Sequence, residues 1–148
     1  MMTSAKNFFS KTQQQAILNS IKAAELNTSG EVKVHIENHC KGPVLDRAAE
    51  IFSLLNMHKT KLRNGVLFYL AVKDHKFAIL GDAGINSVVS GNFWDSIKED
   101  MQKQFQQGKF TEGLSEGIQR AGEQLKVHFP YQSDDVNELP DDISFRKS

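Results

Sequence analysis

Residues 64–72 read Asn-Gly-Val-Leu-Phe-Tyr-Leu-Ala-Val, and the seven residues from position 66 onward are apolar on both faces of an extended chain. Strands with this pattern lie in the middle of a sheet that helices cover on both sides. Residues 73–76 have the polar composition of a hairpin turn, and residues 77–80 predict an antiparallel neighbour that ends at the glycine-containing segment 81–84. The stretch therefore predicts a central strand followed by a hairpin.

Two segments that precede this strand are clearly periodic. Ser10 and Gln13 have the spacing of a capping box, and apolar residues then recur at helical intervals up to residue 26. Residues 31–37 alternate strictly between apolar and polar side chains, which predicts a half-buried strand with a solvated polar face. A helix with an apolar stripe over residues 45–55 is expected to connect this strand to the central one.

After the hairpin, the pattern is helical again. Apolar residues spaced four apart predict a third helix over residues 93–105, and Thr111 is placed to cap a fourth helix. The element order of helix, strand, helix, strand, strand, helix, helix predicts an α/β fold, a three-layer α/β/α sandwich with a central mixed β-sheet. We expect one domain over residues 1–130 and an acidic C-terminal tail over residues 131–148 that runs over the surface.

Length, charge and cysteine content exclude several classes of protein. A chain of 148 residues suits a single domain, and 18 basic residues balance 18 acidic ones, which argues against nucleic acid as the main partner. The single cysteine, Cys40, cannot form an internal disulfide. The sequence has neither a secretory signal nor an apolar run long enough to span a bilayer, so we expect a cytoplasmic protein without a membrane partner.

The chain resembles the TPM domain family in four segments: Ser-Gly-Glu-Val at 29–32, Arg-Asn-Gly-Val-Leu at 63–67, Gly-Asp-Ala-Gly-Ile at 81–85, and the aromatic and glycine positions within 105–114. It looks like a stand-alone, soluble bacterial member. The resemblance covers about residues 10–128 and implies a mixed sheet between helices. It also implies binding of a divalent cation, calcium more than magnesium, and acid phosphatase activity.

The predicted topology brings three oxygen-bearing residues to one edge of the sheet. Glu31 and Asn64 stand at the starts of two parallel strands, and the hairpin returns Asp82 to the same edge. Carboxylate and amide oxygens suit calcium or magnesium, and Asp95, at the start of the third helix, is a further candidate ligand. Alternatively, Asn64 and Asp82 cap turns and Asp95 complements the positive end of its helix.

Three further residues are candidates for contacting a ligand at this edge, namely Arg63, Gly84 and Trp94. In a second hypothesis the chain is a low-specificity, metal-dependent phosphatase in which Arg63 orients phosphate and Asp82 and Asp95 hold the metal. The sequence contains none of the familiar phosphatase motifs. In a third hypothesis the loop at Trp94 or the acidic segment 134–142 binds a protein partner.

His35, Glu37 and His39 share one face of the first predicted strand and could form a metal-binding face, although a solvated polar surface is the simpler interpretation. At the opposite edge of the sheet, Asp46 and the Asp-His pair at 74–75 form a second, weaker candidate site. We interpret Cys40 as an inert loop cysteine.

Overall fold

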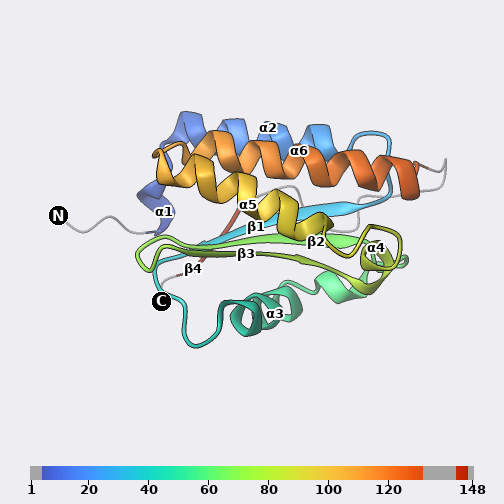
Figure 1. Cartoon of the computed structure of the whole chain (residues 1–148), viewed down its shortest axis with the longest axis horizontal. Coiled ribbons are helices and arrows are strands. Elements are labelled where there is room, and N and C mark those ends of the chain that lie inside the picture. Colours follow the sequence, from blue (N-terminus) through green and yellow to red (C-terminus); the bar gives the residue numbers. More distant parts are fainter. Residues whose placement is uncertain (1–4, 132–142, 147–148) are drawn as a thin grey trace.

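The computed structural model describes residues 5–131 and 143–146, and its centre is a four-stranded mixed sheet (Figure 1). The strands follow the order β3-β2-β1-β4 across the sheet. β1 runs parallel to both of its neighbours, whereas β2 and β3 form an antiparallel hairpin. Their bounds are β1 (Glu31–Glu37), β2 (Gly65–Ala71), β3 (Lys76–Gly81) and β4 (Ile143–Arg146).

Helices cover both faces of the sheet, as the sequence predicts, so the three-layer α/β/α sandwich is confirmed. Figure 1 shows the long helices α2, α5 and α6 on one face of the sheet and α3 on the other. The long helices are α2 (Lys11–Glu25), α5 (Phe93–Gln106) and α6 (Phe110–His128), and α3 spans Val44–Leu54. Short helical turns lie near the ends of the sheet: α1 (Ala5–Phe8), η1 (Met57–Lys59) and α4 (Ala83–Asn86).

The central strand β2 separates two apolar cores. Val66 and Phe68 face the three long helices, whereas Leu67 and Tyr69 lie in a smaller core beneath α3. All seven residues of β2 are buried, as the apolar stretch predicts.

Two glycines let α6 approach its neighbours closely. A Cβ atom on Gly117 would lie 2.7 Å from the sulfur of Met101, and one on Gly122 would lie 2.6 Å from the Cβ of Ala24. Both distances are shorter than carbon contacts allow, so the glycines are required by packing rather than by backbone conformation.

Three expectations about local structure are wrong. All seven residues of β1 are buried, so its polar face is not solvated. Thr111 does not cap α6, because this helix begins at Phe110 and its N-cap is Lys109, without a side-chain hydrogen bond. Part of the expected surface tail, residues 143–146, instead forms β4 along β1. The predicted acidic segment 134–142 lies outside the described residues.

Candidate functional site

The starts of β1 and β2 and the end of β3 meet at one edge of the sheet. Glu31 pairs in register with Gly65, and its N–H donates to the carbonyl of Asn64 at 3.4 Å. The N–H of Asp82 donates to the carbonyl of Gly65 at 2.9 Å. The backbones of the three predicted ligand residues are therefore adjacent, and their side chains decide what the edge can bind.

Asp82 is held by neighbours within the protein. Arg63 donates to both of its carboxylate oxygens, from Nε at 2.7 Å and from Nη2 at 2.8 Å, and Ala83 N–H donates to Oδ1 at 2.7 Å. Burial acts to raise the pKa of Asp82, but these bonds outweigh it, so the pKa lies below its usual value. Asp82 thus caps α4 and fixes the loop before β2, and Arg63 is engaged in the same pair.

The other candidates at this edge have separate roles. Gly84 donates its N–H to the Arg63 carbonyl at 2.7 Å. Trp94 lies in the first turn of α5 rather than in a loop, and its indole N–H donates to Oδ1 of Asn86 at 2.7 Å, which ties the start of α5 to α4. Asp95 is exposed in the first turn of α5, where it complements the positive end of the helix.

Three other side-chain oxygen groups at or beside this edge are buried. Glu31, Thr60 and Asn64 are 2%, 3% and 1% exposed, respectively. The amide Nδ2 of Asn64 donates to the hydroxyl of Ser29 at 3.3 Å. Within residues 5–131 and 143–146, neither Oδ1 of Asn64 nor Oγ1 of Thr60 has a hydrogen-bond partner. A buried oxygen without a partner costs about 1–3 kcal/mol, so each of these two atoms requires ordered water or a further group as its partner.

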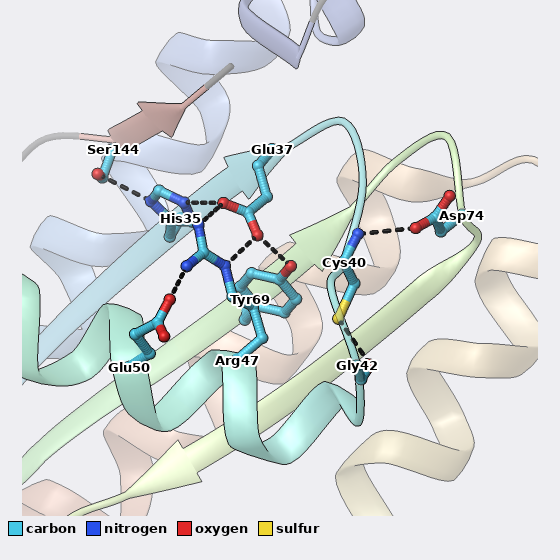
Figure 2. A network of polar contacts seen from close by, with 9 residues as sticks. All are labelled: His35, Glu37, Cys40, Gly42, Arg47, Glu50, Tyr69, Asp74 and Ser144. Carbon is cyan, nitrogen blue, oxygen red and sulfur yellow. Dashed lines mark hydrogen bonds and ion pairs between the residues drawn. The ribbon is translucent and has the colours of Figure 1, made fainter. Parts of the chain in front are cut away.

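A second polar cluster lies between the sheet and α3 (Figure 2). Glu37, the last residue of β1, accepts hydrogen bonds from Arg47 on α3, at 2.8 Å from Nε and 2.9 Å from Nη2. The Tyr69 hydroxyl also donates to Glu37, and Nε2 of His35 lies 3.1 Å from Oε1 of the same carboxylate. Nδ1 of His35 lies 2.9 Å from the Ser144 hydroxyl on β4. The cluster joins four elements of the fold: β1, β2, β4 and α3.

The hydrogen bonds of the cluster determine its charge. Burial acts to raise the pKa of Glu37, but bonds from Arg47, Tyr69 and His35 together lower it below its usual value. Burial and the bond to Glu37 raise the pKa of Tyr69. The cluster therefore contains an ionised carboxylate and a neutral phenol, and the Glu37 carboxylate requires a proton on Nε2 of His35.

The order Ser144, His35, Glu37 matches the connectivity of a serine-hydrolase triad, but the surroundings indicate a structural role. In a triad the carboxylate stabilises the protonated histidine, but here Arg47 already compensates the charge of Glu37. The His35 side chain is also fully buried. His39, the third member of the predicted metal face, bonds instead to Asp74 at 2.9 Å. Among the described residues, no group of three or more His, Cys, Asp or Glu is placed to hold a metal ion.

The loop at the far end of β1 is also organised by hydrogen bonds. Asp74 accepts the N–H of Cys40 at 2.7 Å as well as the bond from His39, and the Cys40 sulfur contacts the Gly42 carbonyl at 3.6 Å. These contacts tie the loop after β1 to the β2–β3 turn. They agree with a structural reading of Cys40 and Asp74.

Sequence reasoning missed the partnership of Arg47 and Tyr69 with Glu37. One signal was present: a tyrosine inside a fully apolar central strand requires a polar partner for its hydroxyl. The partner's identity depended on the packing of α3, which periodicity alone does not give.

The layer arrangement and the edge geometry define a small α/β/α domain with a mixed sheet. Comparison of the sequence with known families identifies the family to which it belongs. The TPM domain profile matches residues 2–124, which is more than half of the chain. The chain belongs to the TPM domain family. No curated protein matches it. Within the described residues, no helix is both long and apolar enough to cross a bilayer.

Solved structures agree with this assignment. The BA42 protein of the psychrophilic bacterium Bizionia argentinensis is 48% identical, with a TM-score of 0.86 over 94% of this chain and 96% of that one. The N-terminal domain of a protein from P. gingivalis shares the fold at 19% identity, with a TM-score of 0.70 over 84% and 82% of the two chains. An N-terminal domain of the cg2496 protein from Corynebacterium glutamicum does so at 11% identity, with a TM-score of 0.63 over 88% and 82%.

Proposed function

We propose that this domain binds a divalent cation, calcium in preference to magnesium, at the sheet edge formed by the start of β1 and the loop before β2. The ligands are the carboxylate of Glu31, Oδ1 of Asn64 and Oγ1 of Thr60. The observation that carries the proposal is the pair of buried oxygens, on Asn64 and Thr60, without a hydrogen-bond partner in the described part of the chain.

The chemistry of these groups favours calcium. Calcium accepts six to eight oxygen ligands, neutral or charged, at about 2.3–2.6 Å in irregular arrangements. Magnesium requires near-octahedral geometry and retains several waters, which suits a buried set of one carboxylate and two neutral oxygens poorly. With Glu31 as the only carboxylate, we expect weak binding, with a dissociation constant of about 10⁻⁴–10⁻³ M.

This ligand set modifies the one that the sequence predicts. Glu31 and Asn64 are retained and Thr60 is added. Asp82 is assigned to the pair with Arg63, where it positions the loop that carries Asn64. Asp95 is left out because it is exposed on α5. The phosphatase hypothesis remains a prediction from family resemblance.

The test is a titration of the full chain with CaCl₂, followed by backbone NMR, with MgCl₂ in parallel. We expect saturable calcium shifts centred on residues 29–32 and 60–65, and smaller shifts with magnesium. Glu31→Gln keeps the shape of the side chain but removes its charge, and should abolish the saturable shifts. Asp95→Asn, which removes a charge from α5, should leave them unchanged.

Two results would overturn the proposal. One is the absence of saturable shifts at calcium concentrations about tenfold above the expected dissociation constant. The other is binding that survives Glu31→Gln and is lost with Asp95→Asn.

A further inference from the structure

A cavity lies at the end of the sheet opposite the proposed cation site. It has a volume of about 470 Å³ and lies beside α1, the β2–β3 turn, the C-terminal half of α5 and the start of α6. Figure 1 shows α1 and this turn at one end of the sheet and α4 at the other. The volume is within the range of about 300–1,000 Å³ that is usual for small-molecule sites.

Aromatic side chains from four elements form the apolar wall of the cavity. Phe77 and Phe105 meet edge to face with ring centroids 4.9 Å apart, and Phe110 lies 5.3 Å from Phe105. Phe8, the last residue of α1, packs against Phe110 at 5.2 Å. Because each ring is fixed by a neighbour, the wall is formed before any ligand arrives, and little ordering is required on binding.

The charged residues at this cavity are all basic. Lys76 and Lys98 line it together with His75, and none of its described lining residues carries a carboxylate. The ammonium of Lys98 lies 5.9 Å from the centroid of the Phe77 ring, so its position follows the aromatic wall. The nearby carboxylate of Asp74 already accepts bonds from His39 and from the Cys40 N–H. These bonds and, more weakly, the charge of Lys76 lower the pKa of that carboxyl, but within residues 5–131 and 143–146 neither lysine forms an ion pair at 4.0 Å or less.

We propose that this cavity binds a small amphipathic carboxylate, with its hydrocarbon body against the phenylalanine wall and its carboxylate between Lys76 and Lys98. An apolar wall alone would accept any hydrophobe, and the two lysines select the anionic headgroup. The volume limits the ligand to a single small molecule. The site lies at the end of the sheet away from Glu31 and Asn64, so the inference is independent of the proposed cation binding.

The test uses octanoate as the probe, with octylammonium and acetate as comparisons, in NMR titrations of the full chain. Octanoate should shift the signals of residues 76–77, 98, 105 and 110 and leave those of 29–32 and 60–65 unchanged. Octylammonium has the same chain with the opposite charge, and acetate has the headgroup without the chain. Both should bind at least tenfold more weakly.

Variants separate the two parts of the site. Lys76→Gln with Lys98→Gln should weaken octanoate binding about tenfold or more, whereas Lys103→Gln, an exposed lysine of α5 outside the cavity, should not. Gln102→Trp, at an exposed helix position that lines the cavity, should fill its mouth and abolish binding without affecting folding.

Vesicles test whether the surface binds membranes instead of free molecules. Co-sedimentation with phosphatidylglycerol vesicles should give no retention of the protein. The proposal is overturned if octanoate causes no localised shifts, if octylammonium binds equally well, if the double lysine variant binds normally, or if vesicles retain the protein while octanoate does not bind.

Discussion

Arg47 of α3 and Glu37 at the end of β1 form a bidentate ion pair. Nε of Arg47 lies 2.8 Å from Oε2 of Glu37, and Nη2 lies 2.9 Å from Oε1. The Glu37 side chain is completely buried, whereas that of Arg47 is 15% exposed. This pair is a polar connection between α3 and the sheet. It explains how one of the four polar residues on that face of β1 can be buried as a charged group.

Removing the cation from this pair should be costly. In Arg47→Met the Glu37 carboxylate stays buried without its guanidinium partner, and losing one member of a buried pair typically costs about 3–5 kcal/mol. We therefore expect the free energy of unfolding, measured by urea denaturation, to fall by about this amount. Arg120→Met is the matched control, because the Arg120–Asp100 pair is much more exposed and should contribute less than about 1 kcal/mol. Equal losses in the two variants would contradict a structural role for the buried pair.

The Glu37 pair also predicts sensitivity to acid. The pKa of the Glu37 carboxyl lies below its ordinary value of 4.5, so this group binds fewer protons in the folded state than in the unfolded chain. The stability that this group provides is complete above about pH 4.5, and it is lost as the pH falls toward the lower pKa of the folded state. Urea midpoints measured from pH 6 to pH 3 should therefore fall. The fall should be shallower in Glu37→Gln than in the parent, and identical slopes would exclude Glu37 as a source.

Tyr69 predicts a loss of stability on the alkaline side. Burial, followed by the hydrogen bond to Glu37, raises its pKa above the ordinary value of 10.0. A raised pKa stabilises the fold fully below pH 10, and this contribution decreases as the pH rises above it, because the unfolded tyrosine then ionises. Tyr69→Phe should cost about 1.5–3 kcal/mol at pH 7, because a bond to a charged group is lost. The difference between the two proteins should shrink above pH 10, and a constant difference up to pH 11 would contradict this assignment.

The elements that could be predicted from the sequence are those whose burial follows one rule. The apolar stretch that becomes β2 has only one compatible environment, and the helices on both faces follow from it. The prediction of a solvated polar face on β1 is wrong, because strict alternation predicts such a face whenever one set of side chains is polar. Glu37 is buried instead because Arg47 and Tyr69 supply compensating partners from elsewhere in the chain. His35 is buried because Ser144 and Glu37 bond to its two ring nitrogens.

The position of the candidate edge could be predicted from the sequence, but the hydrogen-bond partners of its side chains could not. Parallel pairing of β1 with β2 and the hairpin placed Glu31, Asn64 and Asp82 at one edge. The engagement of Asp82 by Arg63 depends on the backbone of Arg63, which has a positive φ of 53°. Such a conformation in a residue other than glycine is uncommon, and no local sequence pattern predicts it.

Gly84 holds the same edge together and provides a sharp test of it. A Cβ atom at this position would lie 2.1 Å from the carbonyl oxygen of Leu62 and 2.6 Å from that of Arg63. These are backbone atoms that cannot rotate away, so Gly84→Ala must displace either α4 or the loop before β2. We expect a loss of about 1–3 kcal/mol in the free energy of unfolding and amide shifts at residues 62–65.

Gly91→Ala is the matched control for this change, because a Cβ there meets no atom within 4 Å and its φ is not positive. It should leave the stability unchanged or slightly raised, since alanine restricts the unfolded chain. If the proposed cation site is correct, Gly84→Ala should also weaken calcium binding, because the displaced loop carries Asn64, whereas Gly91→Ala should not. A Gly84→Ala protein of parental stability would mean that α4 and this loop are less closely packed than the structure indicates.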